Sequence, residues 1–361
     1  MTYKFLIYIS YSYAIPIGDP LEKEILRQGY DVKWFADLPE GNAAISNKKN
    51  ALKSINAVLD YKPHIVLAAT DSVPDFIPAL RVQVFHGFNA QKRPSKKHTF
   101  SHFRIRGFFD LYCTQGPSTT KGFLAKQKEH PHFEVIETGW SKVDPLFPLS
   151  VKPVNEYPMI FIASTFTERL SLAYNDSVFE EIKRLSEKGE FQFSMVLHPK
   201  IERSTVQKWK SLESEKFSFF ETTNLIPLFE NADIMFSDTT SAIQEFILQE
   251  KPVVAYNHTF PHKYLIHVNT VETIEASLKL ALTCPTDIIQ NIKEFIKELH
   301  PYYDGHSSER IIKASISFLH AEKQHLKSKP LNLMRKYKIR KRLNYFTLKS
   351  FNRPFTIKDP S

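Results

Sequence analysis

The sequence predicts an α/β protein made of two parallel-sheet halves followed by a basic C-terminal tail. Short apolar segments alternate with helix-like segments along residues 3–137 and again along residues 159–320, a pattern typical of parallel sheets covered by helices. A proline-rich stretch at residues 144–155 separates the two series. The length of 361 residues also suits two domains. We therefore predict domains at residues 1–148 and 149–320, and a tail at residues 321–361.

Each predicted element follows from an apolar run or from apolar residues at helical spacing. In the first half we expect strands at residues 3–9, 30–35, 64–69, 82–85, 111–114 and 133–137, and helices at 21–28, 50–59 and 118–127. In the second half we expect strands at residues 159–163, 193–198, 217–220 and 233–236, and another beginning at Val253. The helices of this half are expected at residues 177–186, 206–209, 225–231, 273–281, 286–300 and 308–320.

The net charge of +9 comes from the tail. Twelve of the 48 Lys and Arg residues, but only two of the 39 Asp and Glu residues, lie at positions 321–361. The body is close to neutral, so the basic balance does not indicate nucleic-acid binding by the folded domains. Two distant cysteines, Cys113 and Cys284, are typical of reduced cytosolic thiols, and no apolar run is long enough to span a bilayer.

In the first half, the candidate site is His86-Gly87, which follows the strand at residues 82–85. A histidine at a strand end suits a general base, and a glycine beside it permits close backbone approach. A hydrogen-bonded structural histidine is the alternative. The next segment, residues 89–106, carries the basic side chains Lys92, Arg93, Arg104 and Arg106. They indicate either contact with an anionic acceptor or an ordinary solvated loop.

In the second half, polar side chains follow three strands. His198-Pro199 ends one strand, and Thr165 and Thr167 follow another. The segment 237–241 lies between a strand and a helix, where backbone N–H groups favour an anion, and its residues are Ser237, Asp238, Thr239, Thr240 and Ser241. Glu245 lies one turn into that helix, within reach of a ribose. The alternative for this segment is an ordinary helix cap. Because ligands of parallel sheets bind beyond the carboxyl ends of strands, we expect the halves to face each other across a cleft.

Several common site types are not indicated. The Gly-x-Gly-x-x-Gly and P-loop fingerprints are absent, which argues against NAD and nucleotide triphosphatases. His258, His262 and His267 are close in sequence, but their spacing matches no usual ligand pattern. We therefore expect no metal and no cofactor.

Short motifs from about residue 5 to about residue 319 resemble the CDP-glycerol glycerophosphotransferase family, which builds teichoic-acid-like and capsular polymers. They are Val84-Phe85-His86-Gly87, residues 137–144, Val196-Leu197-His198-Pro199, residues 237–241 with Glu245, residues 251–254, and residues 304–310. The chain departs from the family at Phe166 and Thr167, where the family often has Trp and Arg, although Arg169 follows two residues later. It also departs at Ser141, where the family often has Pro. From this resemblance we expect no counterpart of the N-terminal membrane-binding extension of the large polymerases.

The resemblance implies a GT-B fold of two Rossmann-like domains and a metal-independent transferase. It implies that His86 is the base on the acceptor side, with Gly87, Lys92, Arg93, Arg104 and Arg106 near the acceptor. It further implies that His198, Thr165, Thr167 and residues 237–241 hold the pyrophosphate of a CDP-polyol, while Glu245 contacts the ribose. The acceptor would be a glycan or a lipid-linked molecule. The alternatives are a sugar transferase, a UDP-sugar 2-epimerase, and a non-catalytic glycan-binding relative.

The tail combines charge with apolar side chains. Six basic residues lie within residues 334–343, followed by Tyr345, Phe346, Leu348 and Phe351. Such a segment suits an anionic membrane surface, although a disordered basic tail is the alternative. The expected location is therefore cytoplasmic and peripheral, on the inner face of the cell membrane.

Overall fold

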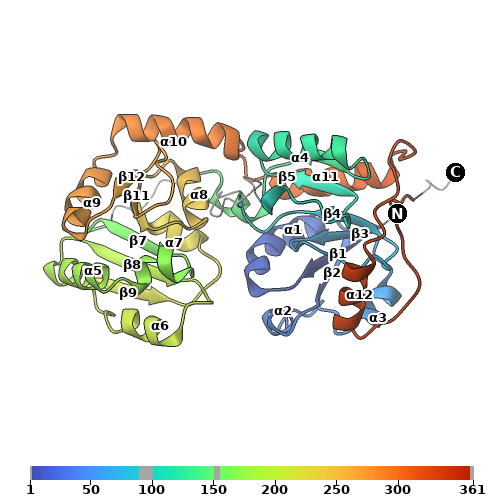
Figure 1. Cartoon of the computed structure of the whole chain (residues 1–361), viewed down its shortest axis with the longest axis horizontal. Coiled ribbons are helices and arrows are strands. Elements are labelled where there is room, and N and C mark those ends of the chain that lie inside the picture. Colours follow the sequence, from blue (N-terminus) through green and yellow to red (C-terminus); the bar gives the residue numbers. More distant parts are fainter. Residues whose placement is uncertain (1, 89–100, 150–154, 358–361) are drawn as a thin grey trace. The chain divides into compact units, whose positions relative to one another are not determined.

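A computed structural model describes residues 2–88, 101–149 and 155–357 of the chain. The chain forms two compact units, which Figure 1 labels by element. Among the described residues, the first unit contains 2–87, 101–148 and 299–357, and the second is built mainly from 155–298. The predicted division differs, because residues 299–320 and the tail both belong to the first unit.

The first unit contains a six-stranded parallel sheet in the order β2-β1-β3-β4-β5-β6. Its strands are β1 (Lys4–Ile9), β2 (Asp31–Ala36), β3 (Ile65–Ala68), β4 (Leu80–Gln83), β5 (Leu111–Thr114) and β6 (Glu134–Glu137). Its helices are α1 (Ile15–Arg27), α2 (Pro39–Ala44), α3 (Ile55–Tyr61), α4 (Pro117–Glu129), α11 (Ser307–His320) and α12 (Leu333–Arg342). Residues of α3, α4 and α12 share one hydrophobic cluster with Leu6, Tyr8 and Val66 of the sheet.

The second unit repeats this architecture with the strand order β12-β11-β10-β7-β8-β9, again fully parallel. Its strands are β7 (Met159–Ser164), β8 (Gln192–Leu197), β9 (Phe217–Phe220), β10 (Ile234–Ser237), β11 (Val253–Tyr256) and β12 (Ile266–Val268). Its helices are α5 (Asp176–Lys188), α6 (Arg203–Lys210), α7 (Ile226–Asn231), α8 (Ala242–Phe246), α9 (Ile274–Leu282) and α10 (Thr286–Leu299), the last of which ends in the first unit. The predicted α/β class with two parallel-sheet domains is confirmed.

In the two sheet domains, the elements that the sequence prediction missed or started too late are short or begin at prolines. Helix α12 in the tail was also not predicted, although it has ten residues. Helix α1 starts six residues before its predicted start, because Pro16 is tolerated in the first turn, where an N–H has no helical partner. Helix α2 is only six residues long and begins at Pro39. Strand β12 is a three-residue edge strand, too short to show a clear period.

The tail is an integral part of the first unit. Lys336 and Arg340 of α12 both pair with the buried carboxylate of Asp75, at 3.3 and 2.7 Å. Lys329 pairs with Asp110, whose side chain has no exposed surface. Buried carboxylates need such partners, because an unpaired charge is costly away from water. The tail therefore completes the first unit, and the prediction that it is separate from the folded domains is wrong.

The pairing is reflected in the ionisation of these groups. Burial alone would raise the pKa of Asp75, but hydrogen bonds from Arg340 and Ser350 and the charges of Lys336 and Arg340 hold that pKa below its ordinary value. Burial lowers the pKa of Lys329 to about 8, although the carboxylate of Asp110 acts in the opposite direction. The tail thus contributes charge to the interior as well as to the surface.

Two buried histidines predict a loss of stability in mild acid. Burial lowers the pKa of His300 to about 4, helped by Arg310, and lowers the pKa of His132 to about 4, helped by Lys329. The unfolded chain takes up these protons near pH 6.5, whereas the folded chain does so only near pH 4, so stability is lost as the pH falls through that window. We expect the free energy of unfolding to be about 2 kcal/mol lower per histidine at pH 5 than at pH 7.

Urea unfolding at the two pH values checks this. His132→Gln should reduce the difference, whereas His130→Gln, at an exposed neighbouring position, should leave most of it, because His130 is a smaller cause of the lowered pKa of His132 than burial and Lys329. Equal stability at pH 5 and pH 7 would contradict the prediction.

Candidate functional site

In the first unit, the candidate residues gather at the carboxyl end of the sheet. His86 follows β4, Tyr13 follows β1, and Asp71 follows β3. The rings of His86 and Tyr13 are 5.8 Å apart. Arg106 pairs with Asp71 at 2.9 Å, so this predicted basic side chain lies on the same edge. Arg104 is exposed, and Lys92 and Arg93 lie outside the described residues.

His86 is held by an unusual backbone. Phe85, just before it, has a φ of +61°, a left-handed conformation that is rare for a bulky residue and typical of functional sites. Its carbonyl accepts a hydrogen bond from the indole Nε1 of Trp140 at 3.3 Å, and its ring packs on Phe123 and Tyr112. Trp140 is fully buried, and its backbone N–H donates to Nε2 of His300. These contacts fix the backbone from which the imidazole projects.

The imidazole of His86 is well suited to accept a proton. Its side chain keeps an exposed surface, and its ring nitrogens have no hydrogen-bond partner in the part of the chain that the structure describes. Desolvation by the surrounding protein lowers the pKa of His86 below its ordinary value, while Asp71 acts to raise it and Arg106 to lower it. A lowered pKa keeps the imidazole neutral, and therefore basic, at pH 7. At Gly87 a Cβ would meet no described atom within 4 Å, so local packing does not explain the glycine.

In the second unit, Asp238 ties two strand ends together. Its carboxylate accepts hydrogen bonds from the hydroxyl of Ser164 and from the backbone N–H groups of Thr165 and Leu172, the last two at 2.9 Å. Ser237 donates to the carbonyl of Ala163 at 2.6 Å. Ser237 and Asp238 have no exposed surface. Their hydrogen bonds hold the loop in place, and we do not assign them contact with a ligand.

The other predicted donor residues lie around this support. Thr165 is buried beside Asp238, and Thr167 is half-buried. The hydroxyl of Thr239 accepts from the N–H of Thr259 at 3.2 Å, which joins the loop after β11 to the loop after β10. The hydroxyl of Thr240 accepts from the N–H of Ala242 at 3.4 Å and so caps α8. The N-cap residue itself, Ser241, makes no side-chain cap hydrogen bond, so only Thr240 supports the start of the helix. Contact between these threonines and a donor stays a prediction.

Two expectations about this loop are weakened. Helix α8 has only five residues before a 3-10 turn, so its dipole contributes less to an anion site than a long helix would. Glu245 retains only 5% of its surface exposed, and Ser241 is half-buried at the helix start. In this structure Glu245 is too buried to contact a ribose.

His198 lies at the end of β8 beside the same loops. Its Nδ1 accepts the backbone N–H of Lys200 at 3.1 Å, so the proton of the neutral ring resides on Nε2. Its ring lies 4.5 Å from that of Phe166, which follows β7, and Lys200 lies over the Phe166 ring. From the sequence, Phe166 is only a departure from a family motif. The structure shows that it packs directly against the predicted phosphate-binding histidine.

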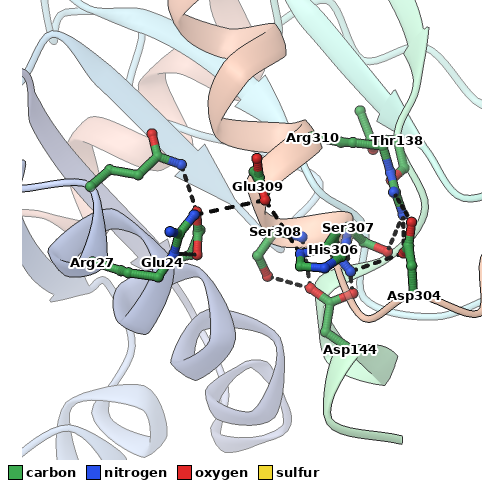
Figure 2. A network of polar contacts seen from close by, with 11 residues as sticks. Glu24, Arg27, Thr138, Asp144, Asp304, His306, Ser307, Ser308, Glu309 and Arg310 are labelled. Carbon is green, nitrogen blue, oxygen red and sulfur yellow. Dashed lines mark hydrogen bonds and ion pairs between the residues drawn. The ribbon is translucent and has the colours of Figure 1, made fainter. Parts of the chain in front are cut away.

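Two of the family-like motifs, residues 137–144 and 304–310, form a structural hydrogen-bond network and not a ligand site. Figure 2 shows Asp144 pointing at the start of α11, where it accepts hydrogen bonds from the N–H groups of Ser307 and Ser308 at 2.9 and 2.7 Å. Arg310 donates to the carbonyl of Thr138 and pairs with Asp304, both at 2.7 Å. Residues 137–144 and 304–310 therefore anchor α11 to the sheet.

No group of three or more His, Cys, Asp or Glu side chains within residues 2–88, 101–149 and 155–357 has the geometry to hold a metal ion. In the same ranges, every helix is too short or too polar to cross a bilayer.

Comparison with known proteins defines the fold. No protein-family model matches the chain, and no curated protein matches its sequence. Among solved structures, it is similar to the UDP complex of Staphylococcus aureus MnaA (14% identity, TM-score 0.61, 88% of this chain and 97% of that one). A putative UDP-N-acetylglucosamine 2-epimerase from Listeria monocytogenes gives 14% identity and a TM-score of 0.62, covering 90% and 98%. A variant of the wall teichoic acid polymerase TagF gives 10% identity and a TM-score of 0.60, covering 88% and 90%.

These matches and the two parallel sheets define a GT-B-type fold. At 10–14% identity they establish the architecture alone.

Proposed function

We propose that this chain transfers glycerol phosphate, or a related polyol phosphate, from a CDP-linked donor to a hydroxyl group of a cell-surface glycan or lipid-linked acceptor. The observation that carries the proposal is the pair of histidines at strand ends, one in each unit. His86 is exposed and follows a residue with a strained backbone, while His198 lies at the end of β8 beside hydroxyl-rich loops, with its Nδ1 accepting the N–H of Lys200. A TagF variant has been studied after soaking with CDPG, which supports a CDP-linked donor for this fold.

In the proposed reaction, the candidate residues of each unit have a separate role. His86 takes the proton of the acceptor hydroxyl, and the acceptor oxygen attacks the β-phosphorus of the donor. The bond from that phosphorus to the oxygen bridging the two phosphates breaks, and CMP leaves. His198 and the threonines of the second unit meet the negative charge that develops on the phosphate oxygens. Side-chain donors suit this role because they are already oriented before the reaction.

A UDP-sugar 2-epimerase is the second candidate. The MnaA structure contains UDP, and its TM-score is close to that of the TagF variant, so the fold accommodates both kinds of nucleotide. An epimerase acts on its nucleotide sugar without an acceptor. The two candidates therefore differ in nucleotide preference and in the need for a second substrate.

Thermal stabilisation by nucleotides tests the proposal. We expect CDP-glycerol or CDP-ribitol to raise the Tm more than UDP-N-acetylglucosamine does, because a bound ligand stabilises the folded state by mass action. His198→Ala should reduce the shift, and His130→Ala, an exposed histidine of the other unit, should not. A larger shift with the UDP-sugar would favour the epimerase.

The surface of α12 supports membrane association of the enzyme on the cytoplasmic side. Several apolar side chains of this region are exposed, from 54% to fully, namely Leu331, Leu333, Met334, Tyr337, Phe346 and Leu348. Lys338, Lys341 and Lys349 are exposed among them. Exposed apolar side chains with lysines among them suit insertion into the headgroup region of an anionic membrane.

We therefore expect binding to anionic liposomes through this face. Replacing Leu333, Met334 and Leu348 by Ser should weaken binding about 100-fold, since each side chain loses its insertion into apolar surroundings. The matched control replaces Leu26, Leu124 and Leu280, which are exposed elsewhere. Equal binding by both triple variants, measured by liposome sedimentation, would exclude docking through α12.

A further inference from the structure

A cavity lies in the first unit, at the carboxyl end of β2 and away from β4. Its volume is about 320 Å³, at the lower end of the range for small-molecule sites. The lining comes from the end of β2, Asn42 of α2, the start of α3, and residues 342–345 at and just after the end of α12. The tail segment therefore forms one wall, and all lining residues belong to one unit.

The cavity is built around an oriented arginine. Arg342 lines it with a side chain that is 30% exposed, and its Nη2 pairs with Asp37 at 2.5 Å. Asp37 is fully buried and also accepts hydrogen bonds from the hydroxyls of Tyr8 and Ser10, at 2.5 and 2.6 Å. Burial and the neighbouring carboxylate raise the pKa of Tyr8, so its phenol stays a donor. This buried carboxylate is saturated by its own partners and fixes the guanidinium at the cavity wall.

The other polar side chains of the cavity can all donate hydrogen bonds, and of these Asn42 already donates to the carbonyl of Leu38. Lys53, Asn56 and Asn344 line it, and none of their side chains has a hydrogen-bond partner in the described part of the chain. Asp37 is the single carboxylate of the lining, and its charge is already paired. Phe35, Ile55 and Tyr345 supply apolar wall. A cavity with unused cationic and amide donors favours a ligand rich in anionic acceptor oxygens.

We propose that this cavity binds a phosphate ester of a small polyol, as an anchoring site for the acceptor. The geometry of the sheet supports an extended acceptor. In the order β2-β1-β3-β4, the ends of β2 and β4 are three strand spacings apart, or about 14 Å. An acceptor with its phosphate on Arg342 and Lys53 extends along the sheet edge toward His86. The assignment to the acceptor rests on the proposed function, whereas the binding of the phosphate ester does not.

Titration of the full-length protein with sn-glycerol 3-phosphate, using glycerol as the uncharged reference, tests the site. We expect the phosphate ester to bind and glycerol to bind far more weakly. Lys53→Met should weaken the affinity about tenfold, the loss expected for one charge-assisted hydrogen bond. Arg342→Lys keeps the charge opposite Asp37 but loses the planar fork, and should weaken binding by a similar factor. Lys49→Met removes an exposed lysine that does not line the cavity, and should have no effect.

Absence of binding in the unmodified protein, or affinity unchanged in both cavity variants, would overturn the proposal. In a transfer assay the same variants should raise the KM for a phosphate-bearing acceptor and leave kcat unchanged. If glycerol phosphate binds as expected but no CDP-linked donor reacts, the transferase assignment fails and the anion site stands.

Discussion

Replacing His86 with alanine is expected to lower the rate of transfer by at least about a hundredfold while nucleotide binding is retained. General-base catalysis contributes roughly 10²–10⁴-fold, and His86 is the candidate base of the first unit. The substitution removes an exposed side chain, so the fold should survive. The predicted donor contacts all lie in the other unit and should keep their affinity. Steady-state kinetics with a CDP-polyol, together with a nucleotide titration, measure both quantities.

The pH dependence of the unmodified enzyme supplies an independent check. The base must be neutral to accept a proton, and the pKa of His86 lies below its ordinary value of about 6.5. The rate should therefore stay on its plateau at pH 7 and decline only below about pH 6.5. His306→Ala, at an exposed histidine of the same unit, is the matched control. Undiminished turnover in the His86 variant would remove it from the mechanism.

The second large effect concerns the tail. Arg340→Met should lower the free energy of unfolding by about 3 kcal/mol, because it leaves the buried carboxylate of Asp75 with one cation fewer. The Tm should fall by about 5–10 °C. Both side chains are at most 10% exposed, so solvent screens the pair only weakly. Removal of the whole tail also removes Lys329, which pairs with the buried carboxylate of Asp110. A chain ending at residue 320 should therefore not fold stably.

The control for this prediction lies on the same helix. Lys338→Met removes an exposed cation of α12 and should change stability by less than about 0.5 kcal/mol. The double variant Asp75→Asn, Arg340→Met should recover part of the loss, because the buried carboxylate is removed together with its arginine and Lys336 keeps its hydrogen bonds to Ser350 and Asn352. Equal unfolding curves for the Arg340 and Lys338 variants would show that the tail is a surface appendage.

Much of the architecture was predictable because it depends on local patterns. Apolar runs located the strands, and their alternation with helices indicated parallel sheets. The strand-end rule then predicted that Thr165, His198 and residues 237–241 share one edge, and the order β10-β7-β8 brings them there. The role of Trp140 was missed, since its contact with the Phe85 carbonyl joins positions 55 residues apart.

The remaining errors come from burial and distant pairing. The sequence could not distinguish basic residues of α12 that enter the domain from those that face solvent. Arg340 and Lys338 differ only in which side of the helix they occupy, and Asp75 lies 265 residues before Arg340. From its position after a strand, Asp238 was likewise predicted to bind a ligand. In the structure its carboxylate is buried and accepts hydrogen bonds from Ser164 and Leu172. Local polarity does not reveal tertiary partners.

The nucleotide product tests the central claim most directly. The full-length protein is incubated with CDP-glycerol and a lipid-linked glycerol phosphate acceptor, and the released nucleotide is identified by chromatography. Attack at the β-phosphorus predicts CMP, formed only when the acceptor is present and lost in the His86→Ala variant. Release of CDP, or isomerisation of UDP-N-acetylglucosamine without any acceptor, would contradict the phosphotransfer account.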